Sequence, residues 1–161
     1  ATFFVVGEDA LLYPELVKKQ TDAGHEVENH SFTHPNLLTR TDLTTNEEIL
    51  WGQEAVQKII KRTPVYFRPP RKLYNDDIVK LADIYGYKII LWTVCLENRQ
   101  CPTPKTMVNR VMTKVSPGAI ILAHDGRMDR SKTVESLPLL IKSLQEEGYR
   151  LVTLHDLLTK Y

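Results

Sequence analysis

The sequence lacks several features that would assign it at once to a familiar class of protein. It has no excess of one charge, with 21 Lys and Arg against 20 Asp and Glu, so it offers no basic stripe for a nucleic acid. No apolar run approaches the roughly 18 residues that a membrane span needs. Only two cysteines occur, Cys95 and Cys101, which could form one bridge or remain free thiols. No disulfide framework is therefore indicated.

The chain also lacks an initiator methionine, internal repeats and low-complexity tracts. It begins at Ala1 and passes directly into an apolar stretch at residues 2–6, so we expect a chain that is cut at its N-terminus. The absence of a signal peptide then carries no information. A length of 161 residues with 42% hydrophobic residues suits one globular unit. We predict a single domain over residues 1–161.

Short apolar stretches alternate with amphipathic ones along the chain. The pattern predicts strands at residues 2–6, 26–29, 65–67, 88–94, 119–123 and 150–153. It predicts helices at residues 14–24, 45–61, 75–86, 105–114, 134–147 and 156–161, the second of which begins with a capping box of Thr45 and Glu48. Strands that alternate with helices predict an α/β fold with a parallel sheet, as an open sheet or a closed barrel.

His30 and His34 stand four residues apart, directly after the second predicted strand. On one helical turn, or on a tight turn that imitates it, two such imidazoles face the same way and can share a divalent cation. Zinc suits them, and nickel, cobalt or iron would also be accepted. A catalytic metal needs a third protein ligand and an open position for water. The alternative is a plain pair of surface or capping histidines.

Three other notable side chains lie near the end of a predicted strand or directly after one. Arg68 precedes Pro69 and Pro70, and such a rigidly held guanidinium can orient a carboxylate, although a plain surface arginine is the alternative. His124 suits a general acid or base, or a histidine bonded to backbone at a strand end. Trp92 fits a core position, a ligand platform, or both. Because the carboxyl ends of parallel strands meet at one edge, we expect these residues and His30 to converge there.

Several ordered motifs resemble those of the polysaccharide deacetylase family, the NodB-homology domain of carbohydrate esterase family 4. The resemblance runs from end to end, in residues 1–7, 24–35, 68–71, 122–126 and 148–154. It implies a distorted (β/α) barrel, here incomplete at the N-terminus. It also implies a metal-dependent hydrolase that removes acetyl groups from chitin, peptidoglycan, xylan or their oligosaccharides, and an extracellular or cell-wall location.

The resemblance further implies a role for each matching residue. His30 and His34 would bind the metal, most commonly zinc, with cobalt or nickel as alternatives. Arg68 would orient the catalytic base, and the backbone N–H of Arg71 would help to hold the oxyanion, although the family more often has Tyr there. The remaining roles are the acetyl pocket, formed by Leu122 with Trp92, and protonation of the leaving group by His124.

Two departures from the family pattern lead to further expectations. The family's Asp-Asp motif, which supplies the base and a third metal ligand, is absent, and Asp76-Asp77 reads as ordinary acids at a helix start. Cys95 and Asn98 stand where the family often has aspartates, and Arg99 stands where it has Trp. Asn98 is then expected to hydrogen-bond His124, without stabilising an imidazolium as a carboxylate would.

Three functions remain open from the sequence. The first is a deacetylase that is impaired by the loss of its first motif. The second is a non-catalytic relative that binds a glycan or a protein, and the third is a relative that hydrolyses a small cyclic amide. A missing strand would expose a sheet edge, so self-association there is also expected.

Overall fold

The computed structural model describes residues 1–97 and 103–160, and these residues form two compact units. The first unit contains residues 1–91 together with residues 153–155, and the second contains the other described residues. That both belong to one domain stays a prediction. Each unit contains short parallel strands and helices that pack against apolar side chains.

The first unit is organised by a four-stranded parallel sheet in the order β1-β2-β3-β4. Its strands are β1 (Thr2–Val5), β2 (Glu26–Asn29), β3 (Tyr66–Phe67) and β4 (Lys88–Ile89). In the register of the sheet, the last residues of all four strands lie level: Val5 is opposite Asn29, Asn29 opposite Phe67, and Phe67 opposite Ile89. The segments after β2, β3 and β4 therefore leave the sheet at one edge.

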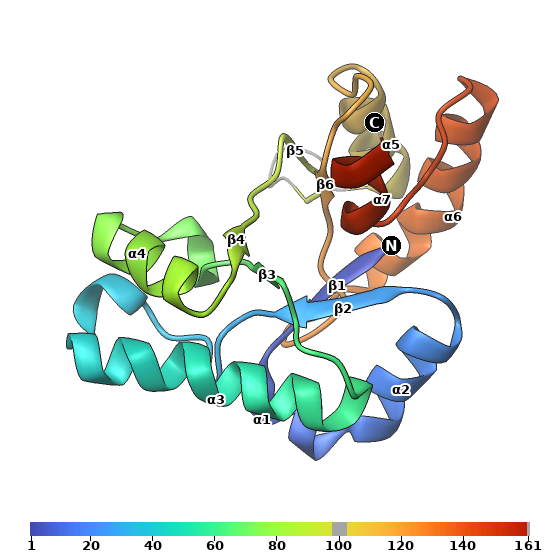
Figure 1. The fold of residues 1–161 in the computed structure, drawn as a ribbon. Coiled ribbons are helices and arrows are strands. Elements are labelled where there is room, and N and C mark those ends of the chain that lie inside the picture. The colour runs from blue at the N-terminus through green and yellow to red at the C-terminus, as the bar shows by residue number, and fades with distance from the viewer. Residues whose placement is uncertain (98–102, 161) are drawn as a thin grey trace. The chain divides into compact units, whose positions relative to one another are not determined.

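Helices of the first unit pack beside this sheet (Figure 1). They are α1 (Gly7–Leu12), α2 (Pro14–Asp22), α3 (Asp42–Ile60) and α4 (Asp76–Ile84), with the short 3-10 turns η1 (Leu37–Thr39) and η2 (Pro70–Lys72). Two apolar clusters fill the contacts. One contains Ala10, Val17, Val27 and Val56, and the other contains Leu37, Ile49, Phe67, Ile78, Ala82 and Tyr87.

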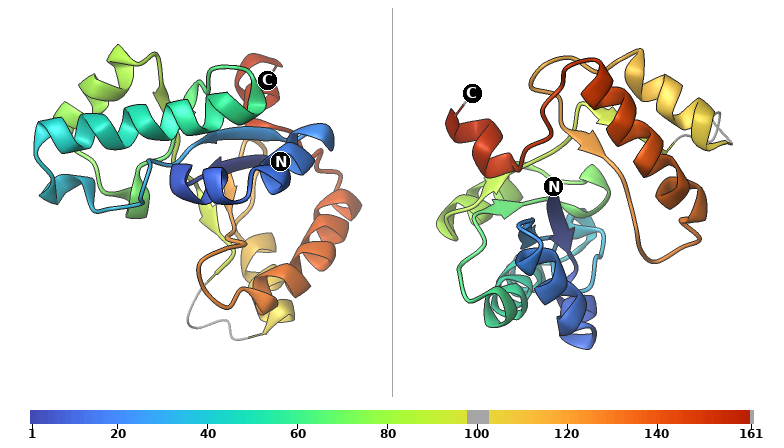
Figure 2. Two further views of the ribbon diagram at one scale, coloured as in Figure 1. Left: turned by 90° about the horizontal axis from the view of Figure 1, so that it is seen from below. Right: turned by 90° about the vertical axis from the view of Figure 1, so that its right-hand side faces the viewer.

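The second unit contains a two-stranded parallel sheet of β5 (Val94–Cys95) and β6 (Ile121–Leu122). Helices α5 (Pro104–Met112) and α6 (Ser131–Glu146) lie side by side in both views of Figure 2. The core of this unit consists of buried residues from both helices and from the segment around β5: Val94, Leu96, Met107, Val108, Val111, Leu140 and Leu144. The last helix, α7 (Leu154–Lys160), begins in the first unit and continues into the second.

The predicted fold class is confirmed, because every strand pair in the described residues is parallel and helices connect successive strands within each unit. Three local predictions are wrong. Helix α3 begins at Asp42 with Thr41 as its cap, so Thr45 and Glu48 do not form a capping box. The predicted strand 88–94 is divided into β4 and the start of β5, and residues 150–153 form no strand. Within the described ranges, no helix has the length and apolarity of a membrane span.

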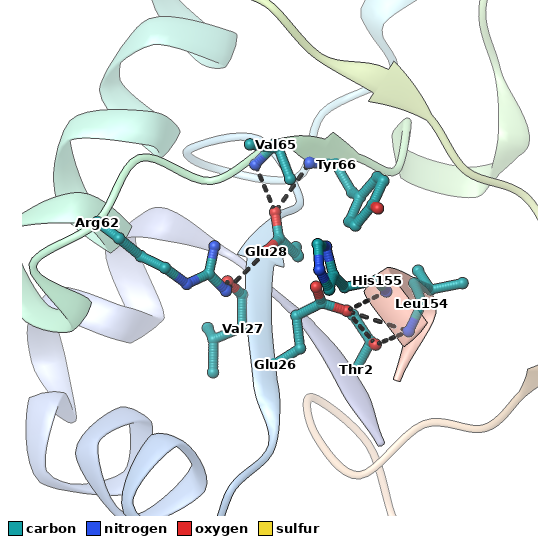
Figure 3. Close-up of polar contacts among 9 residues, drawn as sticks. All are labelled: Thr2, Glu26, Val27, Glu28, Arg62, Val65, Tyr66, Leu154 and His155. Carbon is teal, nitrogen blue, oxygen red and sulfur yellow. Dashed lines mark hydrogen bonds and ion pairs between the residues drawn. The ribbon is translucent and has the colours of Figure 1, made fainter. Parts of the chain in front are cut away.

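A buried carboxylate on β2 ties β3 to the sheet (Figure 3). Glu28 is fully buried, and its Oε2 accepts hydrogen bonds from the backbone N–H groups of Val65 and Tyr66 at 2.7 and 2.8 Å. Its Oε1 lies 2.8 Å from the guanidinium of Arg62. Burial raises the pKa of Glu28, while these bonds act against that rise. The ion pair with Arg62 therefore compensates a charge that water does not solvate.

A second carboxylate on β2 ties the start of α7 to the same sheet (Figure 3). Glu26 accepts hydrogen bonds from the N–H groups of Leu154 and His155 at 3.1 and 3.3 Å, and from the hydroxyl of Thr2 at 2.6 Å. An acid at a helix start satisfies N–H groups that have no partner within the helix. These contacts explain why residues 153–155 belong to the first unit.

Candidate active site

The segment from His30 to His34 forms a tight, irregular turn after β2 and not a helical one. Ser31 and His34 both have left-handed backbone conformations, with φ of 66° and 62°. The buried Ser31 stabilises the turn, because its Oγ accepts a hydrogen bond from the N–H of His34 at 3.0 Å. The two imidazole rings meet edge to face with their centroids 4.9 Å apart. The turn thus brings together the two predicted metal ligands.

The orientation of His30 leaves one ring nitrogen suited to a metal. Its Nδ1 lies 2.6 Å from the backbone oxygen of Arg68. A carbonyl oxygen can only accept a hydrogen bond, so Nδ1 carries the proton and Nε2 carries the lone pair in the neutral ring. Metal-binding histidines in proteins are commonly oriented by such a bond from the other nitrogen. Arg68 therefore positions His30 through its backbone.

The guanidinium of Arg68 is buried at the edge of the sheet. Its Nε and one Nη donate to the backbone oxygens of Ile90 and Leu91, at 3.2 and 3.4 Å, and its charged end lies 4.0 Å from the centre of the Phe4 ring. Burial lowers the pKa of Arg68 to about 10, so the side chain keeps its charge at neutral pH. The side chain connects the end of β3 to the residues after β4.

Arg71 lies in the short turn η2, where its backbone and that of Lys72 are left-handed, with φ of 57° and 62°. The described chain contains six such residues other than glycine, and four of them belong to the two turns that carry predicted site residues. Left-handed conformations cost energy in residues with a side chain and often occur at functional sites. This clustering favours a function at the turns after β2 and β3.

The described residues fit part of a metal site. Two neutral imidazoles, one of them oriented by a carbonyl, match the chemistry that zinc prefers. Among residues 1–97 and 103–160, however, no three His, Cys, Asp or Glu side chains are placed to hold one ion together. His30 and His34 therefore stay predicted ligands of a metal ion.

The predicted acid, His124, follows β6 in the second unit and has a carboxylate partner. Its Nδ1 lies 3.3 Å from Oε2 of Glu97, and its backbone N–H donates to Oε1 of Glu97 at 2.7 Å. The hydroxyl of Thr133 donates to the same Oε1 at 3.2 Å. Burial by itself would raise the pKa of Glu97, but the hydrogen bonds from His124 outweigh it and hold that pKa at about 2.

Glu97 corrects the expectation that His124 lacks a carboxylate partner. The acids of the family align with Cys95 and Asn98, and Glu97 stands between these two positions. Asn98 lies outside the described residues. Cys95 lies on β5 with its Sγ 3.6 Å from Glu97, and burial raises the pKa of its thiol. Because Glu97 is adjacent to Asn98, one of the aligned acid positions, the sequence could have indicated it as the carboxylate partner of His124.

The other predicted site residues of the second unit are placed as follows. Leu122 is buried in β6, and its backbone oxygen accepts a hydrogen bond from the N–H of Leu96 at 2.8 Å. Trp92 is half-buried just before β5. Their role in an acetyl pocket stays a prediction.

Three residues that the sequence did not reveal support the histidine turn. The side chain of Asn29 donates to the backbone oxygen of Ile49 and accepts from the N–H of Ser31 at 3.0 Å. Gly52 allows α3 to approach, because an added Cβ would lie 2.4 Å from Oδ1 of Asn29. Glu48, also on α3, accepts hydrogen bonds from Phe32 and Thr33. Their roles depend on contacts between segments far apart in the chain.

Comparison with known proteins gives a consistent result. The family model described as polysaccharide deacetylase matches residues 1–90. A peptidoglycan-N-acetylglucosamine deacetylase of Bacillus cereus is 37% identical over 160 residues, which cover 98% of this chain and 75% of that protein.

Solved structures agree with the sequence match. Peptidoglycan deacetylase PdaC of Bacillus subtilis is 34% identical, with a TM-score of 0.86 over 98% of this chain and 75% of the other. A CE4 family pseudoenzyme of Bacillus anthracis is 33% identical, with a TM-score of 0.91 over 99% of this chain. The present chain covers only 56% of that structure.

Proposed function

Since the chain belongs to the polysaccharide deacetylase family, we propose that it takes part in the metal-assisted removal of acetyl groups from an acetylated polysaccharide or oligosaccharide. Most of the similar proteins that are named for a polymer are named for peptidoglycan, which favours peptidoglycan over chitin or xylan as the polymer class. A place of action at the cell wall follows from that substrate.

The observation that carries the proposal is the bond between His30 Nδ1 and the backbone oxygen of Arg68. It presents Nε2 of His30 in the protonation state that a divalent cation requires, with the ring of His34 beside it. In the proposed site His30 and His34 hold the cation, with zinc the best match and cobalt or nickel as alternatives. When bound, the ion polarises the acetyl carbonyl and lowers the pKa of a coordinated water.

The chain's own residues then have distinct tasks. The buried Arg68 orients His30 and holds the residues after β4, and its retained charge suits the positioning of a catalytic carboxylate. The backbone N–H of Arg71 donates to the oxyanion that forms during attack on the carbonyl. Leu122 and Trp92 line the space for the acetyl methyl group.

Proton transfer to the leaving group is assigned to His124. It protonates the departing amine or alcohol as general acid. Glu97, 3.3 Å away, orients the ring through Nδ1, which leaves Nε2 for the leaving group. This pairing gives His124 the carboxylate that Cys95 and Asn98 cannot supply.

We propose that the chain by itself turns over slowly, because the described residues contain no group of three His, Cys, Asp or Glu side chains placed to hold one ion, whereas a catalytic site has three protein ligands. The alternative is a non-catalytic member that binds a glycan or a protein. It is favoured by one observation, the high similarity to a structure described as a pseudoenzyme. Hydrolysis of a small cyclic amide would use the same two histidines, and it has no separate observation in its favour.

Zinc titration with a competing chelator tests the proposal, on this chain and on a His30→Ala/His34→Ala variant. We expect one zinc per chain, lost in the variant. Acetate release is then measured on acetylated peptidoglycan, chitooligosaccharide and xylan, with a His124→Ala variant as control. Stoichiometric zinc without acetate release, even at high protein concentration, would support the binding protein. No zinc in either protein would refute the metal site.

Association through a sheet edge also stays a prediction. β1 is an outer strand of the four-stranded sheet, and outer strands present unpaired backbone groups. We expect dimers or larger species in light scattering at high concentration. A strictly monomeric protein over the whole concentration range would contradict this expectation.

A further inference from the structure

The turn between the two histidines is held by a carboxylate from a distant helix. Glu48 lies on α3, and only 9% of its surface is exposed. Its Oε2 accepts hydrogen bonds from the backbone N–H groups of Phe32 and Thr33, at 3.0 and 2.8 Å. Its Oε1 accepts a third bond, from the hydroxyl of Thr33 at 2.6 Å. All three donors belong to the two residues that separate Ser31 from His34.

These bonds act where the turn needs support. Left-handed conformations at Ser31 and His34 are costly for residues with side chains, so the surrounding structure must hold them. Ser31 supports the His34 end through its hydroxyl. In the middle of the turn, Glu48 holds the N–H groups of Phe32 and Thr33, and the backbone N–H of Glu8 donates to the oxygen of Phe32 at 3.0 Å. The two oxygens of one carboxylate offer enough lone pairs to accept all three bonds, so Glu48 can fix both peptide groups.

The helix that carries Glu48 is built to approach the turn. Gly52 lies one helical turn further along the same face of α3, and an added Cβ there would lie 2.9 Å from the carbonyl carbon of Ser31. The backbone oxygen of Ile49, between them, accepts from the side chain of Asn29. Contacts of three α3 residues, Glu48, Ile49 and Gly52, therefore set the distance between α3 and the turn.

We propose that Glu48 is a positioning residue for the metal site: through Phe32 and Thr33 it sets the relative placement of the His30 and His34 imidazoles. This inference rests on the proposed function, since it assigns a metal to those rings. Glu48 itself touches neither ring nitrogen in the proposal, and it acts only through the backbone of the turn. The geometry of its hydrogen bonds, and not its charge, carries the effect.

Four variants separate geometry from charge. Glu48→Ala removes all three acceptors. Glu48→Asp keeps the charge but withdraws the carboxylate by one methylene group. Glu48→Gln loses the charge but keeps the shape, because its amide oxygen can accept from both N–H groups while its NH₂ donates to the Thr33 hydroxyl. The matched control is Glu54→Ala, on an exposed position of the same helix.

Zinc affinity is the first readout, measured by chelator competition on each purified chain. Changes in the residues that orient metal ligands typically weaken affinity about 10–100-fold, and we expect a loss in this range for Glu48→Ala and Glu48→Asp. Glu48→Gln and Glu54→Ala should stay within about threefold of the unmodified chain, since both keep the turn's hydrogen bonds. Visible absorption of the cobalt-loaded chains should change for Ala and Asp only.

Amide hydrogen exchange of the metal-free chains is the second readout. The N–H groups of Phe32 and Thr33 should exchange faster in Glu48→Ala than in the unmodified chain, while Glu48→Gln keeps their protection. Circular dichroism shows whether each variant is folded, and the Asp and Gln variants decide the question if the Ala variant does not fold.

The outcomes distinguish this inference from the proposed function. Unchanged zinc affinity in folded Glu48→Ala overturns the positioning role. The positioning role is also overturned if Glu48→Gln and Glu48→Ala lose equal zinc affinity while Glu48→Asp loses none, because the charge of Glu48 would then be the cause. If the unmodified chain binds no zinc, the metal site of the proposed function fails. In that case unchanged exchange at Phe32 and Thr33 would separately refute the role of Glu48.

Discussion

Replacement of Glu97 by glutamine should remove a pH-dependent part of the stability of the second unit. Glu97 accepts hydrogen bonds from the His124 backbone and from Thr133, and it pairs with the His124 ring at 3.3 Å. These contacts hold its pKa at about 2, below the ordinary value of 4.5. Glutamine keeps the shape and one accepting oxygen, and it loses the ion pair.

The pKa of Glu97 sets the size and the sign of the effect. A difference between pKa values of 4.5 and about 2 corresponds to roughly 3.5 kcal/mol at most, at about 1.4 kcal/mol per unit. Glu97 and His124 are 20% and 44% exposed, so screening by water reduces the value to about 1–2 kcal/mol. Because the folded state has the lower pKa, the stabilisation is present above pH 4.5 and is lost as the pH falls towards 2.

Urea unfolding at pH 5.5 and at pH 3 measures this effect. We expect Glu97→Gln to lower the free energy of unfolding by about 1–2 kcal/mol at pH 5.5 and by less than half of that at pH 3. Glu135→Gln, an exposed substitution on α6, is the control and should change little at either pH. An equal loss at the two pH values, or a loss no larger than that of the control, would refute the reasoning.

Two further substitutions test contacts in the first unit. Gly52→Ala places a Cβ 2.4 Å from Asn29 Oδ1, so it should lower the free energy of unfolding in urea by roughly 1–3 kcal/mol. The control Gly126→Ala has no atom near its added Cβ and should change the free energy of unfolding very little. Equal effects of the two substitutions would contradict the close approach of α3. Arg62→Ala leaves the buried carboxylate of Glu28 without its partner and should cost roughly 2–3 kcal/mol at pH 7, below the full value for a buried pair because Arg62 is 43% exposed. Burial raises the pKa of Glu28, so this carboxylate takes up a proton more readily in the folded state than in the unfolded chain. The free energy of unfolding that Arg62→Ala removes should therefore become smaller as the pH falls from 7 to 5. A loss that does not depend on pH would count against this account.

Local signals predicted most of the secondary structure. Asn75 caps α4 as its sequence context indicated, and the apolar run before Gly7 forms β1. The wrong predictions concern residues whose structure is set by contacts with distant segments and not by the local pattern. Glu48 matched the spacing of a capping box, yet its carboxylate is used by the turn after β2, and Thr41 caps the helix instead. The apolar run at residues 88–94 matched one strand, but its two ends pair with different neighbours.

The candidate site shows the same division. The spacing of His30 and His34, and their place after a strand, indicated a candidate pair of metal ligands, and the structure brings their two rings together at the sheet edge. The protonated nitrogen of His30 depends on the carbonyl of Arg68, which is 38 residues away in the chain. Likewise the partner of His124 is Glu97, 27 residues away, and no spacing rule connects the two.

The sequence by itself determined the alternation of strands and helices, the parallel α/β class and the kinds of side chain at the strand ends. Those properties follow from periodicity, capping and residue type, which act over a few residues. Only the tertiary structure decided which groups support the functional side chains. Glu48, Gly52, Glu97 and the Arg68 carbonyl acquire their roles from hydrogen bonds and close packing between distant segments, and such contacts exist only once the chain has folded.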